Sequence, residues 1–352
     1  MQIDHYLRAL IEKDASDLHF IAGQPPRMRM YGELAPYEED VLSSRRAEQI
    51  LTEIMPEKAR DQLEKQDSAD FAYSIEGLAR FRVNVLRHMG GLGGVFRAIP
   101  SQAKTLDQLN MPPAIKNLCK QTSGLMLVTG KTGSGKSTTL AAMIAEINAN
   151  LHGHIITIED PIEFVHEHNN CLISQREVGE HCKNFADALH SALREDPDVI
   201  LVGEMRDLET IGIAVTAAEM GILVMGTLHT NGAGQTVDRI VNVFPSEKQA
   251  HVRTMLSTSL KGVVSQQLIP KKDGGLAAAL EILVNNSATA NLIRQGKLDQ
   301  LETAMQAGRS AGMNTMDKAL SELFDAGTIS GKSAYEFANE KDTFKEHRLL
   351  DT

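Results

Sequence analysis

Hydrophobic and polar residues are distributed in two different ways along this chain of 352 residues, and the change falls close to Gly124. Before Gly124, apolar positions recur at helical spacing or alternate with polar ones, as amphipathic helices and half-buried strands require. After Gly124, short uninterrupted apolar runs are separated by helical patterns. Continuous apolar strands that alternate with helices predict a parallel sheet covered on both faces, and therefore an α/β fold.

Residues 1–100 have the pattern of a small α/β domain. The pattern predicts a helix, a hairpin, a helical stretch and three further strands, over residues 1–13, 16–34, 43–65 and 69–100 respectively. The turns of the hairpin region are expected at Gly23–Pro26 and at Gly32. In the last stretch, strand alternation places Arg80 and Arg82 on one face, opposite the apolar residues between them.

The second region is built around four apolar runs that predict the strands of the parallel sheet. These runs are "LMLVTG", "HIITIED", "DVILVGE" and "ILVMGTLHT", at residues 125–130, 154–160, 198–204 and 222–230. Residues 101–123 before them predict a linker with a short helix, interrupted at Pro112-Pro113. From residue 271 onward the chain is polar and helical in pattern, with Met316 and Leu320 at helical spacing.

A glycine-rich loop directly follows the first apolar run. It has the form Gly130-x-x-x-x-Gly135-Lys136-Ser137, between a predicted strand and a predicted helix, which is the context that a phosphate-binding loop needs. Its backbone N–H groups would surround the phosphates, with Lys136 on the β- and γ-phosphates and Ser137 on Mg²⁺. A merely flexible loop does not account for this context. The predicted ATP contacts are Thr132, Gly133, Ser134, Gly135, Lys136, Ser137 and Thr138.

Polar residues follow three other apolar runs, where ligands gather in open α/β sheets. Glu204 can orient the water that attacks the γ-phosphate. Glu159 and Asp160, with Glu163 close behind, can hold Mg²⁺ through water. His229 can hydrogen-bond the γ-phosphate or a catalytic carboxylate. The alternatives are a solvated acid at residue 204 and a structural histidine at residue 229.

Composition narrows the function further. The chain has 36 Lys and Arg against 46 Asp and Glu, a net charge of −10, which argues against nucleic acid as the main partner. A DNA translocase is therefore disfavoured. Three cysteines in no C-x-x-C pair fit a reducing cytoplasm better than a disulfide framework. No apolar run approaches the ~20 residues of a membrane span.

A zinc site is a competing interpretation of one short region. It contains five residues of zinc-binding type, His166, His168, Cys171, His181 and Cys182. Their spacing matches no standard structural zinc pattern, so zinc is disfavoured.

Several segments together resemble the bacterial secretion NTPases, and most of all the type IV pilus retraction ATPases, the PilT family of twitching motility. They are "SDLHF", "GKTGSGKSTTLAAMI", "HIITIEDPIEF", "NCLISQREVG", "ALREDPDVILVGEMRDLETI" and "GTLHTNGAGQTVDRIVNVFP". They run in the family's order over nearly the whole chain. Gly203 before Glu204, where many P-loop enzymes have Asp, is normal in this family.

The resemblance implies a PAS-like α/β domain at 1–100, a linker at 101–123, a RecA-like P-loop ATPase core at 124–270 and a helical C-terminal region at 271–352. It implies a homohexamer that hydrolyses ATP with Mg²⁺ and acts on an inner-membrane pilus platform protein. The protein would be cytoplasmic and peripheral to the inner membrane at the pilus base, with no nucleic acid partner.

The resemblance also assigns roles to individual residues. Glu204 matches the catalytic glutamate, Glu163 the acid box and His229 the His box. The first-domain arginines fall where the family's arginines approach the nucleotide of a neighbouring subunit; they are Arg80, Arg82 and Arg97.

The tail departs from the family pattern. Retraction ATPases typically carry "AIRNLIRE", and this chain has "ATANLIRQ", Ala288 to Gln295, which lacks two of the charges. An accessory paralogue, PilU-like, or a nucleotide-gated adaptor that modulates another pilus motor therefore stays open beside the retraction motor. In either case a paralogous pilus ATPase would be a further partner.

Overall fold

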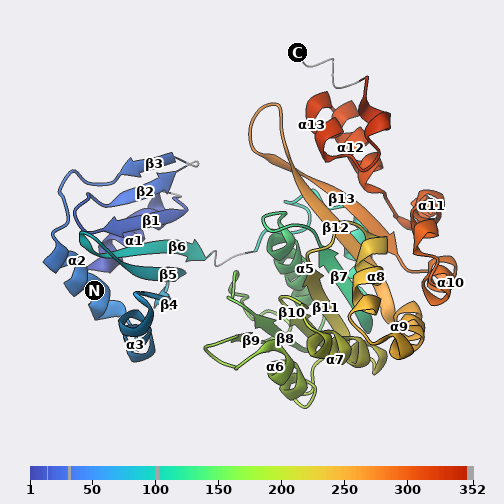
Figure 1. Cartoon of the computed structure of the whole chain (residues 1–352), viewed down its shortest axis with the longest axis horizontal. Helices are drawn as coiled ribbons and strands as arrows, with labels where there is room; N and C mark the ends of the chain where they lie inside the picture. The colour runs from blue at the N-terminus through green and yellow to red at the C-terminus, as the bar shows by residue number, and fades with distance from the viewer. Residues whose placement is uncertain (14, 31–32, 100–102, 347–352) are drawn as a thin grey trace. The chain divides into compact units, whose positions relative to one another are not determined.

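The computed structural model describes residues 1–13, 15–30, 33–99 and 103–346 (Figure 1). The chain forms two compact units, Met1–Gln102 with Glu163–Val165, and Ala103–Ile162 with His166–Thr352. Each unit has its own sheet and its own hydrophobic core. The predicted turn at Gly32 and the first two residues of the predicted linker lie outside the described residues.

The first unit contains a six-stranded antiparallel sheet in the order β3-β2-β1-β6-β5-β4. Its strands are β1 (Asp17–Ile21), β2 (Arg27–Met30), β3 (Glu33–Pro36), β4 (Ser68–Ile75), β5 (Ala79–His88) and β6 (Gly91–Ile99). The predicted hairpin and the three later strands are confirmed. The helices are α1 (Ile3–Glu12), α2 (Ser44–Ile54) and α3 (Glu57–Gln66).

The single helical pattern at 43–65 is divided in two by Pro56. Proline has no backbone N–H, so it ends a helix or stands at the start of one. Here α2 ends at Ile54 and α3 begins at Glu57, and the Ser43 hydroxyl caps the start of α2. Helices α1, α2 and α3 pack on one face of the sheet of this unit, where Phe20, Phe81, Phe96 and their neighbours form the core.

The second unit contains a seven-stranded sheet in the order β13-β12-β7-β11-β10-β8-β9 (Figure 1). All pairs are parallel except β12–β13. Its strands are β7 (Gly124–Thr129), β8 (His154–Glu159), β9 (Leu172–Glu177), β10 (Val199–Val202), β11 (Leu223–Leu228), β12 (Leu260–Pro270) and β13 (Leu276–Val284). The helices up to β12 are α4 (Pro113–Leu118), α5 (Lys136–Asn150), α6 (Phe185–Ala192), α7 (Leu208–Glu219), α8 (Ala233–Asn242) and α9 (Ser246–Ser259).

Both faces of this sheet are covered, as the apolar runs predicted. On one face Leu127 and Ile200 pack with residues of α6 to α9. On the other, Met126 and Leu201 pack with residues of α4 and α5. Every residue of β7, β10 and β11 is buried, so polar side chains of these central strands are found mainly at their ends.

Two predictions about flanking segments are corrected by the structure. The region from residue 271 was expected to be helical, but Leu276–Val284 forms β13 and pairs with β12. Its alanine and leucine content suits a helix as well as a strand, and pairing with β12 decides the outcome. In the predicted linker, Pro113 opens α4 at its first position instead of interrupting it, since that position needs no N–H donor. Residues 103–123 also group with the second unit, and Ile115 is buried in its core.

The C-terminal helices begin after β13. They are α10 (Ser287–Gln295), α11 (Leu301–Ala307), α12 (Met316–Asp325) and α13 (Gly331–Phe337), with short 3₁₀ turns at Leu298–Gln300, Arg309–Ala311 and Lys341–Phe344. Figure 1 shows β12 and β13 as a long hairpin that reaches α12 and α13. There Met316 and Leu320 pack against Ile269 and Ala279 of the hairpin, which confirms the predicted helical spacing.

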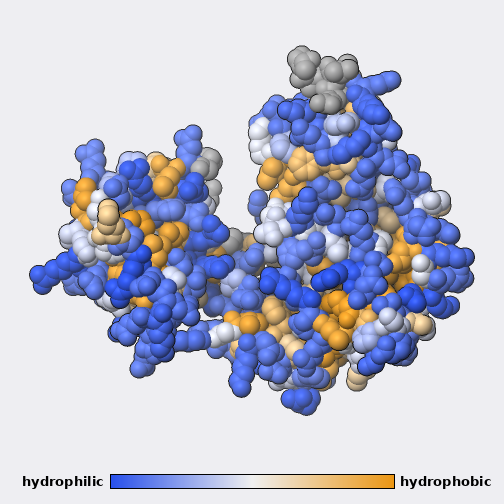
Figure 2. Space-filling view, in the orientation of Figure 1, coloured by the Kyte–Doolittle hydropathy of each residue, from blue (hydrophilic) through white to orange (hydrophobic). Residues whose placement is uncertain are grey.

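The surface visible in Figure 2 is largely hydrophilic. Within the described residues, no helix is long and apolar enough to cross a membrane.

Candidate nucleotide-binding and catalytic site

The glycine-rich loop joins β7 to α5 at the carboxyl edge of the second sheet. Gly130, Gly133 and Gly135 all have positive φ, at 141°, 79° and 88°, which residues with a Cβ rarely adopt. The chain therefore turns tightly, and α5 starts at Lys136. The start of a helix presents unpaired N–H groups and the positive end of the helix dipole, which favour phosphate.

Gln266 of β12 lies directly beneath this loop. Its side-chain oxygen accepts a hydrogen bond from the Thr139 hydroxyl at 2.7 Å. A Cβ on Gly135 would lie 2.7 Å from the Gln266 amide nitrogen, so a larger residue would displace that amide as well as strain the positive φ. The loop is thus held in a fixed shape by the neighbouring strand.

The predicted phosphate contacts occupy the loop and the first turn of α5. Lys136 is buried, and its Nζ donates to the carbonyls of Gly130 and Lys131 at 2.9 and 3.0 Å. These bonds hold the amine over the loop. Within the described residues, the buried Ser134 hydroxyl has no hydrogen-bond partner. A buried polar atom in such a loop is what a phosphate oxygen would satisfy. The other contacts are exposed or half-buried at the same turn: Thr132, Gly133, Ser137 and Thr138.

Parallel pairing brings the ends of the other strands to the same edge of the sheet. The order β7-β11-β10-β8 places the loop, His229, Glu204 and Glu159 at the carboxyl ends of successive strands. Three of these four positions are titratable. The predicted convergence of polar residues at one edge is confirmed for these residues.

Glu204 is held by two side chains, His229 and Arg206. Its Oε1 lies 2.8 Å from Nε2 of His229, and Arg206 contacts the same carboxylate at 2.5 Å. Burial alone would raise the pKa of Glu204, but the hydrogen bond from Arg206 and the interaction with His229 outweigh it and lower the pKa. The carboxylate is therefore ionised at neutral pH, as the orientation of a water molecule requires.

Arg206 was not singled out in the sequence. The available clue is its position two residues after Glu204 in "VGEMRD", which allows the two side chains to meet beyond the end of β10. Two residues apart is a weak signal, because loop geometry decides whether such side chains approach each other.

The glycine before Glu204 has a packing reason. A Cβ on Gly203 would lie 3.1 Å from the Ile158 carbonyl oxygen and 3.2 Å from Cα of Glu159. The Gly203 N–H also donates to that carbonyl at 2.7 Å. A larger residue would push β10 away from β8, so the Asp that many P-loop enzymes carry here does not fit without a shift.

Glu159 lies at the end of β8 beside Gly203. Its Oε1 accepts hydrogen bonds from Thr157 at 2.6 Å and Gln175 at 3.2 Å. Asp160 follows and is exposed. Glu163 falls in the stretch that groups with the first unit, and its predicted role stays a prediction.

The three predicted arginines lie in the first unit, on the sheet face opposite its core. Arg82 and Arg97 are direct cross-strand partners in the β5–β6 pair, and Arg80 lies two residues before Arg82 on the same face. Arg97 is also tied to the buried Asp17 at 2.8 Å. The structure thus gathers the three arginines on one face, and their action on a neighbouring subunit stays a prediction.

Residues that the competing zinc interpretation invoked form hydrogen bonds within the protein. His168 Nδ1 accepts from the Ile173 N–H at 3.2 Å, and His181 Nδ1 accepts from the Glu177 N–H at 3.0 Å. The Cys171 thiol donates to the Leu151 carbonyl. Across the described part of the chain, no group of three His, Cys, Asp or Glu side chains has a metal-binding arrangement.

Comparison with known proteins gives consistent results. The sequence model of the family "Type II/IV secretion system protein" matches residues 1–340. The chain is 49% identical over 344 residues to a Pseudomonas aeruginosa protein named type IV pilus retractation ATPase PilT, which covers 98% of this chain and 100% of that protein. It is 40% identical over 351 residues to type IV pilus ATPase PilU of the same organism, covering 99% and 91%.

A solved structure described as the pilus retraction motor PilT with bound ADP superposes with a TM-score of 0.90. It is 44% identical and covers 96% of this chain and 97% of its own. The resemblance and the α/β, RecA-like P-loop fold class expected from the sequence are confirmed.

Proposed function

Because the chain belongs to the type II/IV secretion system protein family, we propose that it is an ATP-hydrolysing motor that powers type IV pilus retraction. Two relatives support this reading of the family, the retraction ATPase at 49% identity and the solved retraction motor at 44%. Identity to the PilU relative is lower, at 40%, which favours the motor over the accessory paralogue.

The observation that carries the proposal is the Glu204 carboxylate at the phosphate-loop edge of the sheet. It is ionised, it is oriented by His229 and Arg206, and it projects from a strand two positions from β7. A fixed carboxylate at that place is what a nucleotide hydrolase needs to position water. His229 directly follows the intervening strand, β11. There it contacts Glu204 and could also hydrogen-bond the phosphate.

The residues of the chain fit bound ATP with Mg²⁺, which would supply the phosphoryl group and neutralise its charge. Ser137 would ligate Mg²⁺ directly, while Glu159 and Asp160 would reach it through water. Lys136 and the start of α5 would hold the phosphates, and Glu204 would hold the attacking water in line.

The assembled form that we propose is a homohexamer on the pilus platform protein of the inner membrane. Arg80, Arg82 and Arg97 would stabilise phosphate charge in the neighbouring subunit, and Glu163 would complete the acid box. A mixing experiment tests this arrangement. Arg82→Ala and Lys136→Ala subunits are each expected to be inactive alone, and a mixture should regain turnover because some junctions are intact. No recovery on mixing would count against a shared site.

The decisive experiment is pilus retraction in the native host. Its retraction ATPases are deleted, this chain is expressed alone, and labelled pili are followed by microscopy. Pili should shorten with the intact chain and stay extended with Glu204→Gln. Glu209→Gln, which removes an exposed carboxylate from the first turn of α7, is the matched control and should retract normally.

The accessory interpretation keeps one specific observation in its favour, the altered tail sequence. In the structure Thr289 is fully buried and forms a capping box with Asn286, which stabilises the start of α10. The unusual threonine is therefore compatible with a well-formed helix. If pili stay extended while the purified chain hydrolyses ATP, the accessory role is supported instead.

A further inference from the structure

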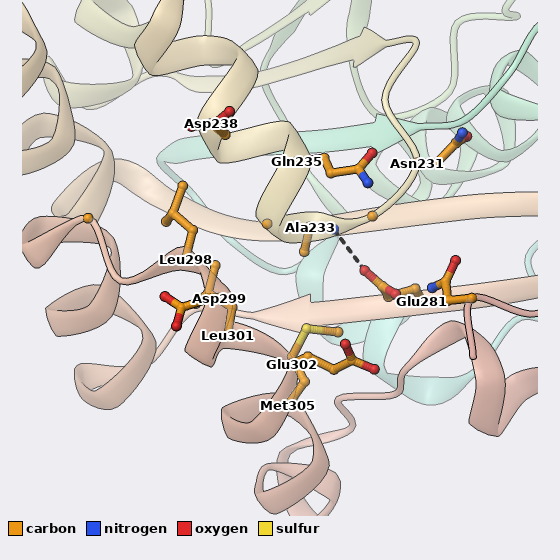
Figure 3. Close-up of a pocket in the computed structure, with 14 residues that line it drawn as sticks. Asn231, Ala233, Gln235, Asp238, Glu281, Leu298, Asp299, Leu301, Glu302 and Met305 are labelled. Carbon is orange, nitrogen blue, oxygen red and sulfur yellow. Dashed lines mark hydrogen bonds between the residues drawn. The ribbon is translucent and has the colours of Figure 1, made fainter. Parts of the chain in front are cut away.

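Two helices of the second unit share one buried carboxylate as their N-terminal cap. The first N–H of α8, from Ala233, donates to Oε1 of Glu281 at 2.7 Å. The first N–H of α12, from Met316, donates to Oε2 of the same side chain at 3.3 Å. Glu281 is 8% exposed and comes from the middle of β13 (Figure 3).

This arrangement differs from the usual way in which the chain caps its helices. Ser43, Asn184 and Asp207 each cap the helix that they precede. The residue before α8 is Gly232, which has no side chain, and within the described residues Thr315 before α12 makes no side-chain cap bond. Glu281, on a strand distant in sequence, supplies the hydrogen-bond acceptor that the residue before each helix does not provide. Its negative charge also interacts favourably with the positive end of a helix dipole.

The capped end of α8 is also the end of the loop that carries His229. The loop starts at Leu228, whose position is fixed by pairing with Thr129 of β7. It ends at Gly232, whose N–H donates to the Ser265 hydroxyl at 2.8 Å. Ser265 and Glu281 are cross-strand partners in the β12–β13 hairpin.

Three residues therefore span the distance between two fixed points, and His229 is the first of them. Its Nε2 lies 2.8 Å from Glu204. A shift of the α8 end would move the imidazole relative to that carboxylate, and small displacements of a positioned group cost much rate.

We propose that Glu281 is a positioning residue for ATP hydrolysis: by capping α8 and α12 with one carboxylate, it fixes the His229 loop and ties it to the C-terminal helices. This inference rests on the proposed roles of Glu204 and His229. Movement of α12 against the hairpin would then reach the catalytic carboxylate through two hydrogen bonds and one short loop.

Glu281 lies in a pocket with other acidic residues, one of which provides a control. Burial raises the pKa of Glu281, and the N–H groups of Ala233 and Met316 oppose this rise. The side chain lines a pocket of about 450 Å³ that also contains Asp238, Asp299 and Glu302. Figure 3 shows Glu281 directed at the start of α8, while Glu302 projects from α11. Glu302 is therefore a carboxylate of the same pocket that can be neutralised without touching either cap.

The test is steady-state ATP hydrolysis by the purified full chain, with Glu281→Gln against the matched control Glu302→Gln. Glutamine keeps the shape, but its amide group can accept from only one of the two N–H donors. We expect kcat to fall about fivefold to tenfold in Glu281→Gln with KM changed less than about twofold, since the loss of one cap is of that size. Glu302→Gln should match the wild type in both constants.

Hydrogen exchange on residues 229–240 supplies the second readout. Exchange should accelerate in Glu281→Gln and stay unchanged in Glu302→Gln, because the α8 amides lose an acceptor only in the first variant. Ser265→Ala, which removes the neighbouring acceptor, should lower kcat in the same direction. If Glu281→Gln does not fold, Ser265→Ala decides: a normal kcat overturns the proposal.

Other outcomes are equally clear. An unchanged kcat in Glu281→Gln, or an equal fall in both glutamine variants, overturns the positioning role, the latter because pocket charge would then be responsible. Glu204→Gln is run in parallel. If it retains turnover, the proposed catalytic site itself is wrong; if it is inactive while Glu281→Gln is normal, only the present inference fails.

Discussion

The two sheets of this chain place their charged residues in opposite ways. In the antiparallel sheet of the first unit, helices cover one face and the arginines lie along the strands on the other, at alternate positions such as Arg80 and Arg82. In the mostly parallel sheet of the second unit, both faces are covered. Its central strands β7, β10 and β11 contain no charged residue, and Glu204 and His229 lie just beyond the ends of β10 and β11.

The difference follows from burial. A strand covered on one side has every second position available for a polar side chain. A strand covered on both sides has none along its length, so chemistry is confined to the carboxyl edge, where loops begin. Glu204 and His229 can therefore be found by asking where each buried strand stops, while Arg82 and Arg97 are found by asking which way a side chain faces.

The largest expected effect comes from breaking this rule in the second sheet. Ile200→Asn places an amide at a fully buried position of β10. We expect a loss of about 4 kcal/mol or more in the free energy of unfolding, because the change leaves both a cavity and unsatisfied polar atoms. Urea unfolding followed by circular dichroism measures it.

The matched change in the first sheet is Val95→Asn, at a half-buried position of β6 on the arginine face. It should cost less than about 1 kcal/mol, the range of strand propensity. Equal losses in the two variants would show that coverage of the two faces is not what separates the sheets.

The next effect concerns the edge itself. Lys136→Ala should weaken ATP binding about a hundredfold, or about 2.7 kcal/mol, because it removes the buried amine that is proposed to contact the phosphates. Lys131→Ala removes an exposed lysine of the same loop and should leave affinity within about threefold. Titration with a fluorescent ATP analogue distinguishes them, and equal weakening would mean that general positive charge binds the nucleotide.

Much of this arrangement could be predicted from the sequence, in those segments where the local pattern of residues is compatible with only one structure. The four apolar runs became parallel strands because their length and branching leave few alternatives. The phosphate loop was recognisable because each of its residue types has its own role: the glycines allow the tight turn, the lysine would bind the phosphates and the serine would bind Mg²⁺. Alternation placed Arg80 and Arg82 on one face correctly.

The remainder depended on contacts between distant parts of the chain. Nothing local marks Leu276–Val284 as a strand, since its pairing with β12 determines it. The support of the loop by Gln266 and the double cap by Glu281 join residues far apart in sequence. Such residues are unremarkable polar positions within strands until the register is known.

A smaller effect is expected from Asp17, a buried charged residue on the arginine face. Asp17→Asn should cost about 1 to 2 kcal/mol, because it weakens hydrogen bonds to Arg97 and Ser16 that involve a charged group. Asp70→Asn, an exposed change on the same face, should cost less than about 0.5 kcal/mol. Thermal unfolding of both variants at neutral pH makes the comparison.

Acid should erase the difference between wild type and Asp17→Asn. Burial raises the pKa of Asp17, but the hydrogen bonds from Ser16 and Arg97 lower it by more than burial raises it. The pKa in the folded protein therefore lies below the ordinary value. The stabilisation is therefore complete above about pH 4 and is lost as pH falls through the lower folded pKa. A difference that stays constant from pH 6 to pH 3 would mean that the carboxylate charge contributes nothing.

The smallest expected effect sharpens the contrast most. Arg82 is exposed and lies directly across from Arg97, a residue of like charge. Arg82→Ala should change the free energy of unfolding by less than about 0.5 kcal/mol, as Arg87→Ala on the same strand should, since neither side chain fills a core position. Two like charges opposite each other are mildly unfavourable in a sheet, so we expect a slight gain in the free energy of unfolding.

A residue whose removal leaves the fold intact or slightly more stable is retained for something other than folding. A loss of more than about 1 kcal/mol would instead make Arg82 part of the scaffold, and the open face would then need its arginines as the covered sheet needs its isoleucines.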